Sequence, residues 1–377
     1  MDKPLVMCVV GTRPDAIKSA PYILELKKNA QHADTVVVST GQHREMLDQV
    51  FASFDFQPDV DLQLMRHGQT LGELSARALE GIANTIDEHK PSYILAQGDT
   101  TTTFIASLAA FYSRVPFGHV EAGLRTETID NPFPEEFNRR ATGLIATDHF
   151  APTKWAAKNL ISEGKDPNAI YITGNTGIDA VRWIASRPGE GWYEGRTERL
   201  VLLTTHRREN WGEPQGNIAR AARRLIDECP GTLLVVPMHK NPDVRHTLTS
   251  ILGVHSRIDL IEPPEYERFV KLMNRSALIL TDSGGVQEEA PAFGVPVLVL
   301  RETTERPEGV EAGTAKLVGT DPEAIYAEGL RLLTDSNAYA AMSNAVSPYG
   351  DAQAARRIVS VVLNRLGAPV SKVQMWD

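Results

Sequence analysis

The stretch ILTDSGGVQEEAPAFG, residues 279–294, decides the fold because it places a strand, a turn and a helix in immediate succession. The apolar run 278–281 predicts a buried strand. In the turn that follows, Ser283, Gly284 and Gly285 let a ligand come close to the backbone. The free N–H groups and the positive dipole end of the next helix suit a phosphate. The stretch therefore predicts a strand–turn–helix unit with an anion-binding turn.

Apolar runs that alternate with longer amphipathic segments extend this unit over the whole chain. The runs are short and continuously apolar, which is typical of parallel strands covered on both faces. They lie at 5–10, 35–40, 93–98, 117–123, 149–153, 200–206, 232–239, 258–263, 277–282 and 295–300. Segments such as 71–89 and 216–229 predict helices between the strands. Repeated strand–helix alternation predicts a doubly wound α/β architecture.

The series of strands and helices runs twice, which predicts two Rossmann-type domains with parallel sheets. The first series ends near 172–181, and the polar, glycine-rich stretch 186–198 precedes the second. We expect an N-terminal domain over 1–173, a C-terminal domain over 174–351, and a last helix, about 352–367, that packs back on the N-terminal domain. Two such domains facing each other form an interdomain cleft. Ligands of open α/β sheets bind beyond the carboxyl ends of the strands.

Composition and missing motifs exclude several classes of protein. The formal net charge of −9 argues against nonspecific binding to nucleic acid or to anionic membranes. Cys8 and Cys229 form no CxxC pair, and HExxH is absent, so we expect no metal and no disulfide. Neither GxGxxG nor GxxxxGK[ST] occurs, which removes the fingerprints of dinucleotide dehydrogenases and P-loop NTPases. Without a signal-peptide pattern or a membrane-length apolar run, we expect a cytoplasmic protein.

Charged residues follow the predicted strands of the first half. Arg13 and Lys18 stand at the start of a helix, where they form either an anion clamp or a solvated helix end. Asp99 directly follows a strand and precedes four threonines; it is either a catalytic group or an N-cap. Glu121 also follows a strand, and no helix cap explains it. Glu135 opens a helix, where acids are ordinary dipole partners, so its position alone carries little weight.

The second half supplies cations and another carboxylate. His206 and His239 each stand at the end of a predicted strand, and Arg306 comes after the last strong strand. On a helix, residues four apart share a face, so Gly285 and Glu289 point toward the same ligand. A carboxylate can accept hydrogen bonds from two vicinal hydroxyls. The turn and Glu289 together therefore predict a nucleotide site, in which the turn binds the diphosphate and Glu289 binds the ribose.

The motifs GTRPDAIKSAP, GDTTTT, HVEAGLRT, PEEFNRR, THRREN and TDSGGVQEEAPAFG follow one another in this order. Together they resemble the non-hydrolysing bacterial UDP-N-acetylglucosamine 2-epimerases over about residues 5–365. The resemblance implies a GT-B-like fold and reversible interconversion of UDP-N-acetylglucosamine and UDP-N-acetylmannosamine, by elimination of UDP to 2-acetamidoglucal and re-addition. It further implies that the enzyme needs no NAD or metal, forms a homodimer and supplies N-acetylmannosamine units for cell-surface polysaccharide.

The resemblance also implies roles for residues at the matching motif positions. The catalytic positions are Asp99, Glu121, Glu135 and His206. The positions that bind the UDP-sugar are Arg13, Lys18, Phe269, Ser283, Gly284, Gly285, Glu289 and Arg306. Some members bind a second UDP-N-acetylglucosamine as an activator, and the positions that fit this pattern are Gln42, His43, Glu136 and His239. Two positions differ from the activated members, which have Gln and Arg where this chain has Glu45 and Gly68.

Two other enzyme classes stay open beside this interpretation. A GT-B glycosyltransferase would share the nucleotide half of the site, but it transfers sugar to an acceptor and does not need three carboxylates near C2. A hydrolysing epimerase would release free N-acetylmannosamine and UDP. A non-catalytic nucleotide sensor is a third and more distant alternative.

Overall fold

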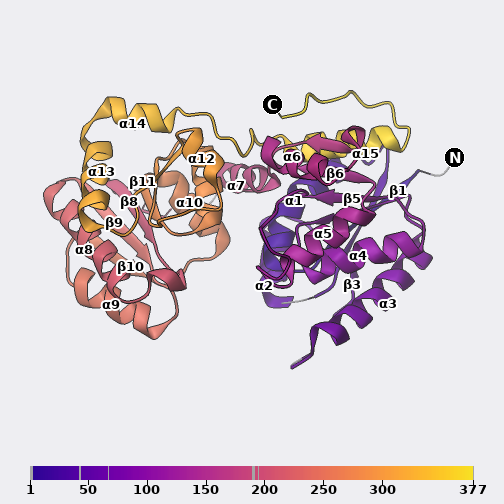
Figure 1. Cartoon of the computed structure of the whole chain (residues 1–377), viewed down its shortest axis with the longest axis horizontal. Coiled ribbons are helices and arrows are strands. Elements are labelled where there is room, and N and C mark those ends of the chain that lie inside the picture. The colour runs from indigo at the N-terminus through magenta and orange to yellow at the C-terminus, as the bar shows by residue number, and fades with distance from the viewer. Residues whose placement is uncertain (1–2, 42–43, 67, 189–191, 194, 377) are drawn as a thin grey trace. The chain divides into compact units, whose positions relative to one another are not determined.

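The structure of the chain is a computed structural model that describes all residues except 1–2, 42–43, 67, 189–191, 194 and 377, and the side chains of 44–46. Its internal contacts divide the chain into two compact units (Figure 1). Unit 1 comprises Met1–Trp183 and Tyr349–Asp377, and unit 2 comprises Ile184–Pro348. Each unit is an α/β layer structure built on one parallel sheet.

Unit 1 contains a parallel sheet in the order β3-β2-β1-β4-β5-β6-β7. Its strands are β1 (Leu5–Val10), β2 (Asp34–Ser39), β3 (Val60–Asp61), β4 (Tyr93–Gln97), β5 (Phe117–Val120), β6 (Asp148–Ala151) and β7 (Ile170–Ile172). Its helices are α1 (Arg13–Lys28), α2 (Arg44–Ser53), α3 (Leu71–His89), α4 (Thr101–Tyr112), α5 (Glu135–Ile145), α6 (Lys154–Ser162), α7 (Thr176–Ser186, which runs on into unit 2) and α15 (Ala354–Arg365).

Unit 2 repeats this plan with the strand order β10-β9-β8-β11-β12-β13, again parallel throughout. Its strands are β8 (Arg199–Thr204), β9 (Thr232–Pro237), β10 (Ile258–Ile261), β11 (Ser276–Thr281), β12 (Val297–Val299) and β13 (Ala315–Leu317). Its helices are α8 (Glu213–Glu228), α9 (Pro242–Leu252), α10 (Tyr266–Arg275), α11 (Gly284–Glu289), α12 (Pro307–Glu311), α13 (Pro322–Thr334) and α14 (Ser336–Ser343).

The central strands form where the sequence is continuously apolar. Every residue of β4 is buried, and so is every residue of β8 after Arg199. Helices on both faces of a parallel sheet remove both sets of alternating side chains from water, which is why these strands show no polar alternation. The short strands β3, β7 and β13 were not predicted. They have two or three residues each and lie at sheet edges, where little apolar sequence is needed.

The C-terminal helix α15 returns to unit 1, where it packs against α1 (Figure 1, yellow). Arg357 on α15 donates to both carboxylate oxygens of Asp351 and to the carbonyl of Thr173 at 3.0 Å. The backbone carbonyl of Thr173 directly follows β7, so α15 is held at the edge of the sheet. The internal contacts separate the two units after Trp183, inside α7, and again before Tyr349. The predicted domain boundary at 173/174 stays a prediction.

In each unit the strand order reverses beside the first strand, between β1 and β4 in unit 1 and between β8 and β11 in unit 2. Loops at such a switch point diverge and leave room for a ligand beyond the carboxyl ends of the strands. Asp99 follows β4 and Asp282 follows β11, so the two carboxylates occupy equivalent places in the two units. Within the described part of the chain, no helix is long and apolar enough to cross a membrane.

Candidate functional site

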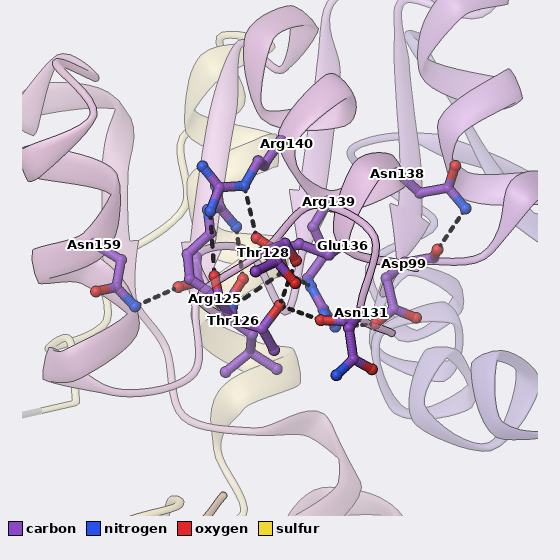
Figure 2. A network of polar contacts seen from close by, with 12 residues as sticks. Asp99, Arg125, Thr126, Thr128, Asn131, Glu136, Asn138, Arg139, Arg140 and Asn159 are labelled. Atoms are coloured by element: carbon purple, nitrogen blue, oxygen red, sulfur yellow. Dashed lines mark hydrogen bonds and ion pairs between the residues drawn. The ribbon is translucent and has the colours of Figure 1, made fainter. Parts of the chain in front are cut away.

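Asp99 is presented by the turn after β4 and is held by helix α5. The N-cap of α4 is Thr100, whose hydroxyl accepts from the N–H of Thr103, so the alternative reading of Asp99 as an N-cap is wrong. The Asp99 carboxylate pairs instead with the guanidinium of Arg139, and the side-chain amide of Asn138 donates to the Asp99 carbonyl at 2.9 Å (Figure 2). Two neighbouring residues of α5 therefore fix both the backbone and the side chain of Asp99.

Glu136 is a buried anchor for this arrangement. Its side chain is 0% exposed and accepts from Nε of Arg139 at 2.9 Å, from Nε of Arg140 at 2.7 Å and from the N–H of Thr126 at 3.3 Å (Figure 2). A buried carboxylate needs such donors to offset the loss of hydration. Glu136 thus orients Arg139, which in turn holds Asp99.

Glu121 follows β5 in the left-handed region of backbone space, with φ of +64°. Such a conformation is uncommon for a residue other than glycine, and it turns the side chain away from the strand direction. The carboxylate, 12% exposed, pairs with Lys18 and also accepts from the side-chain amide of Gln97. The structure therefore brings Lys18 of α1 to Glu121, which directly follows β5. Arg13 is half-buried at the first position of α1.

The run of threonines after Asp99, which is unusual for a helix start, has a packing explanation. A Cβ on Gly11 would lie 2.3 Å from Oγ1 of Thr102, so only glycine lets α4 approach the end of β1 this closely. The hydroxyl of Thr102 lies 3.0 Å from that of Thr40. Thr103 donates to the carbonyl of Gln97 at 2.7 Å. The threonines thus join the turn after β4 to β1 and β2.

The predicted carboxylates of unit 1 affect one another electrostatically. Burial raises the pKa of Asp99, and the negative charge of Glu121 raises it further. Arg139 and Lys18 oppose this rise, and Glu135, half-buried at the start of α5, adds to it. Neighbouring carboxylates with nearby cations give a site in which one acid can hold a proton while another stays ionised. Unit 1 therefore supplies a set of groups suited to acid–base chemistry.

In unit 2, Asp282 organises the loop after β8. The carboxylate is 0% exposed and accepts from the backbone N–H groups of His206 and Arg207, both at 2.9 Å, from Nδ2 of Asn210 at 3.0 Å and from Oγ1 of Thr205 at 3.2 Å. Burial alone would raise the pKa of Asp282, but the hydrogen bonds from His206 and Arg207 outweigh it and lower the pKa. Asp282 was not among the predicted site residues, although its place after a strand matches that of Asp99.

Asp282 also orients the imidazole of His206, whose Nδ1 lies 3.2 Å from Oδ1 of Asp282. With Nδ1 engaged in this way, Nε2 is the nitrogen that can meet a ligand. The ring stacks against that of His239, with centroids 6.2 Å apart and planes 25° apart. A pocket of about 200 Å³ opens beside the two rings; its lining residues are Thr204, Thr205, His206, Pro237, His239, Pro263, Phe269, Ser283 and Val286.

The predicted anion-binding turn lies next to two guanidinium groups. A Cβ on Gly284 would lie 3.8 Å from Nη2 of Arg207 and 3.8 Å from Cζ of Arg306. Nε of Arg207 is buried and has no hydrogen-bond partner among the described residues. A buried donor of this kind indicates a polar ligand that completes it. Arg207 was not predicted, and it strengthens the case for an anion at the Ser283–Gly284 turn.

The two carboxylates that follow this turn have different environments. Glu288 is buried and pairs with Arg306, so it orients a cation of the anion site. Glu289 is half-buried, one helical turn beyond the exposed Gly285. The two residues thus share the accessible face of α11, as the spacing predicts. The ion pair with Arg306 explains why Glu288 stands beside the anion-binding turn. The position of Glu289 is explained by its place on the accessible face of α11.

The predicted second ligand site stays a prediction. Two of its four residues, Gln42 and His43, lie outside the described residues. Glu136 belongs to the buried network that holds Arg139, and His239 lines the same pocket as His206.

Comparison with known proteins agrees with these features. Residues 25–363 match the protein family described as UDP-N-acetylglucosamine 2-epimerase. The UDP-N-acetylglucosamine 2-epimerase of Bacillus subtilis (strain 168) is 50% identical, with 97% of each chain covered. A crystal structure of UDP-N-acetylglucosamine 2-epimerase is 47% identical and covers 100% of both chains with a TM-score of 0.94. The fold is GT-B-like, as predicted.

A further solved structure has the UDP-sugar bound. The UDP-GlcNAc 2-epimerase of Neisseria meningitidis, in complex with UDP-GlcNAc, is 44% identical, has a TM-score of 0.82, and covers 96% of this chain and 100% of its own. The family match at residues 25–363 extends over both units. The chain belongs to the UDP-N-acetylglucosamine 2-epimerase family.

Proposed function

We propose that this protein is an isomerase that interconverts UDP-N-acetylglucosamine and UDP-N-acetylmannosamine by inverting C2. The observation that carries the proposal is the set of carboxylates in unit 1. The charges of Glu121 and Glu135 act on Asp99, while Lys18 pairs with Glu121 and Arg139 pairs with Asp99. The Neisseria relative, at 44% identity, binds UDP-GlcNAc. Inversion of a sugar carbon requires acid–base groups, which this cluster offers.

The chemistry is an elimination followed by an addition. One carboxylate takes the C2 proton, the C2–H electron pair forms the C1–C2 double bond, and the C1–O bond to UDP breaks. The products are 2-acetamidoglucal and UDP. Return of a proton to the opposite face of C2 and re-addition of UDP at C1 complete the inversion. Because the proton leaves one face of C2 and arrives on the other, two acid–base groups are needed. Asp99 and Glu121 are candidates for these two groups, since they follow different strands, β4 and β5.

Unit 2 holds the nucleotide in this proposal. The backbone N–H groups of Gly284 and Gly285, together with Arg207 and Arg306, bind the diphosphate and stabilise the charge of departing UDP. The N–H of Ser283 instead donates to the hydroxyl of Thr281 at 3.0 Å. Glu289 accepts hydrogen bonds from the ribose hydroxyls. Phe269 lines the pocket beside His206 and packs against the uracil. His206, fixed by Asp282, is placed next to the same turn and takes part in catalysis at the sugar-phosphate bond.

The test is the identity of the products. The purified full chain is incubated with UDP-N-acetylglucosamine in ordinary water and followed by ¹H and ³¹P NMR. We expect UDP-N-acetylmannosamine to appear until a constant ratio of the two UDP-sugars is reached, with no acceptor added. Free N-acetylmannosamine and UDP would instead identify a hydrolysing epimerase. An unchanged spectrum that reacts only when a sugar acceptor is added would identify a glycosyltransferase.

The protein is further proposed to act in the cytoplasm as a homodimer. Both cysteines are buried and free of disulfides, as is usual in a reducing compartment.

Helices α4 and α5 pack side by side and expose large apolar side chains, with Phe111 63%, Tyr112 66% and Leu144 80% accessible. Exposed apolar groups of this size mark interaction surfaces. Light scattering should show a dimer for the wild type and a monomer for Leu144→Glu. A monomeric wild type would contradict the proposed homodimer.

A further inference from the structure

Asp15 is a buried carboxyl group next to the proposed catalytic cluster. It belongs to the capping box of α1: Oδ2 accepts from the N–H of Thr12 at 3.3 Å, and the hydroxyl of Thr12 accepts from the N–H of Asp15 at 3.4 Å. The two reciprocal hydrogen bonds of a capping box satisfy the helix start without any further contact. The side chain of Asp15, however, is only 6% exposed, and Oδ2 also accepts from the hydroxyl of Thr100 at 3.0 Å.

The chain contains a matched capping box for comparison. Helix α3 begins with Thr70 and Glu73, which exchange the same two hydrogen bonds. Both of these residues are exposed. The box of α3 therefore shows what the motif does for a helix start alone. The hydrogen bond from Thr100 to Asp15 is what the α1 box adds.

The added bond reaches the turn that carries Asp99. Thr100 is the next residue and the N-cap of α4. A Cβ on Gly98 would lie 3.7 Å from Oδ1 of Asp15 and 3.7 Å from Oε2 of Glu121, so the Gly98 backbone is packed near two carboxyl groups. Asp15 thus supports this turn from α1, while Asn138 and Arg139 hold it from α5.

We propose that Asp15 is a positioning residue for the epimerisation: through Thr100 it ties the turn bearing Asp99 to the helix start that bears Lys18. Lys18 is one turn further along α1 and pairs with Glu121. A single helix start therefore fixes the relative placement of two carboxylates that come from different strands. The inference rests on the proposed function, because it concerns groups that act on C2.

The charge state of Asp15 fits this role. Burial raises its pKa to about 7, and the nearby charge of Asp99 contributes to the rise, while the hydrogen bonds from Thr100 and Thr12 oppose it. A neutral carboxyl group can accept a hydrogen bond from the hydroxyl of Thr100 without adding a full negative charge beside Asp99 and Glu121. A side-chain amide can accept in the same way, so Asp15→Asn should preserve the bond, and Asp15→Ala should remove it.

The experiment compares Asp15→Ala, Asp15→Asn and the matched control Glu73→Ala in the full-length enzyme. For folded protein, we expect kcat of Asp15→Ala to fall roughly 10–10²-fold, as for misplaced catalytic groups. KM and the Kd of UDP should stay near the wild-type values, because the nucleotide contacts lie on unit 2. Asp15→Asn should stay within about threefold of wild type in kcat. Glu73→Ala should lose stability without any change in kcat.

Thr100 tests the same bond from the donor side, which keeps the inference testable if Asp15→Ala does not fold. Thr100→Val should lower kcat by the factor seen in Asp15→Ala, the double variant should fall no further, and Thr100→Ser should restore kcat. The proposal is overturned if folded Asp15→Ala or Thr100→Val keeps wild-type kcat, or if Asp15→Asn is as impaired as Asp15→Ala. A wild type that does not epimerise UDP-N-acetylglucosamine would refute the proposed function instead.

Discussion

Asp99 and Asp282 occupy equivalent places in the two units, yet their surroundings give them opposite properties. Asp99 is 30% exposed and has one guanidinium partner, Arg139, and burial raises its pKa. Asp282 is fully enclosed, accepts hydrogen bonds from the backbone and side chains of the loop after β8, and has a lowered pKa. The same position at a strand end thus gives a carboxyl group that can exchange protons in unit 1 and a fixed anion in unit 2.

This difference teaches how one architecture is divided between two tasks. In unit 1 the strand-end acids pair with cations from helices α1 and α5, but burial and the negative charge of Glu121 still raise the pKa of Asp99, which eases its protonation. In unit 2 the strand-end acid, Asp282, accepts hydrogen bonds from the loop that carries His206 and Arg207 and so fixes this loop. The expected consequence is that substitution of the strand-end acids of unit 1 changes turnover, whereas substitution of Asp282 changes the stability of unit 2.

The largest effect is expected for Glu121→Gln. The amide keeps the shape of the side chain but cannot transfer a proton, so kcat should fall by roughly 10²–10⁴. The Kd of UDP, measured by calorimetry, should stay near wild type. Glu127, exposed in the same segment of unit 1, provides the control Glu127→Gln, which should keep full activity. A folded Glu121→Gln enzyme within a few-fold of normal kcat would make Glu121 structural and leave Asp99 and Glu135 to carry the acid–base role.

Glu289→Ala should show the opposite pattern. Loss of hydrogen bonds from the ribose to a charged acceptor should weaken UDP binding by about 1.5–3 kcal/mol per bond in a favourable case. The melting temperature should change little, because Glu289 is half-buried at the end of α11. Glu311→Ala, an exposed change on α12, is the control. Unaltered UDP affinity in a folded Glu289→Ala protein would show that the ribose role is wrong.

The smallest expected effects concern stability as a function of pH, and they have opposite directions for Asp99 and Asp282. The raised pKa of Asp99 means that its contribution to stability is complete below 3.8 and is lost as pH rises through the raised pKa. The lowered pKa of Asp282 means that its contribution is complete above 3.8 and is lost as pH falls through the lowered pKa. Asp99→Asn should therefore gain in melting temperature relative to wild type as pH rises above about 4.

Asp282→Asn should instead be less stable than wild type at neutral pH, by about 1–3 kcal/mol for donors left without their charged acceptor. This deficit should shrink as pH falls below 3.8. Thermal melts of the wild type and the two variants over the acid and neutral range measure both trends. If the two variants shifted with pH in the same direction, the contrast between the two strand ends would be wrong.

Much of the fold could be predicted because it depends on local sequence. Helix α3 coincides with the predicted segment 71–89, and β1 with the predicted run 5–10. Buried parallel strands are recognisable as apolar runs, and amphipathic helices between them by their period. The edge strands β3, β7 and β13 were missed because two or three residues carry too little pattern. The pairing of α15 with α1 depends on contacts distant in sequence, which periodicity does not report.

The site was predictable where chemistry stands directly at a strand end. Asp99, Glu121 and His206 were selected as candidates in this way. Arg139 was not predicted, because its role depends on its contacts with Glu136 and with Asp99, which follows a strand distant in sequence. Asp282 was passed over because the adjoining glycines explained the motif. Asp15 was not predicted either, since its contact with Thr100 joins segments far apart in the chain.

The most direct test of the account is the fate of the C2 hydrogen. Elimination and re-addition must exchange the C2 proton with solvent, because the proton that returns to the opposite face comes from a different group. When wild-type enzyme converts UDP-N-acetylglucosamine in D₂O, NMR should show deuterium at C2 of the UDP-N-acetylmannosamine formed, and Glu121→Gln should slow this incorporation while still binding UDP. UDP-N-acetylmannosamine that fully retains the original C2 proton would contradict proton transfer by the carboxylates of unit 1.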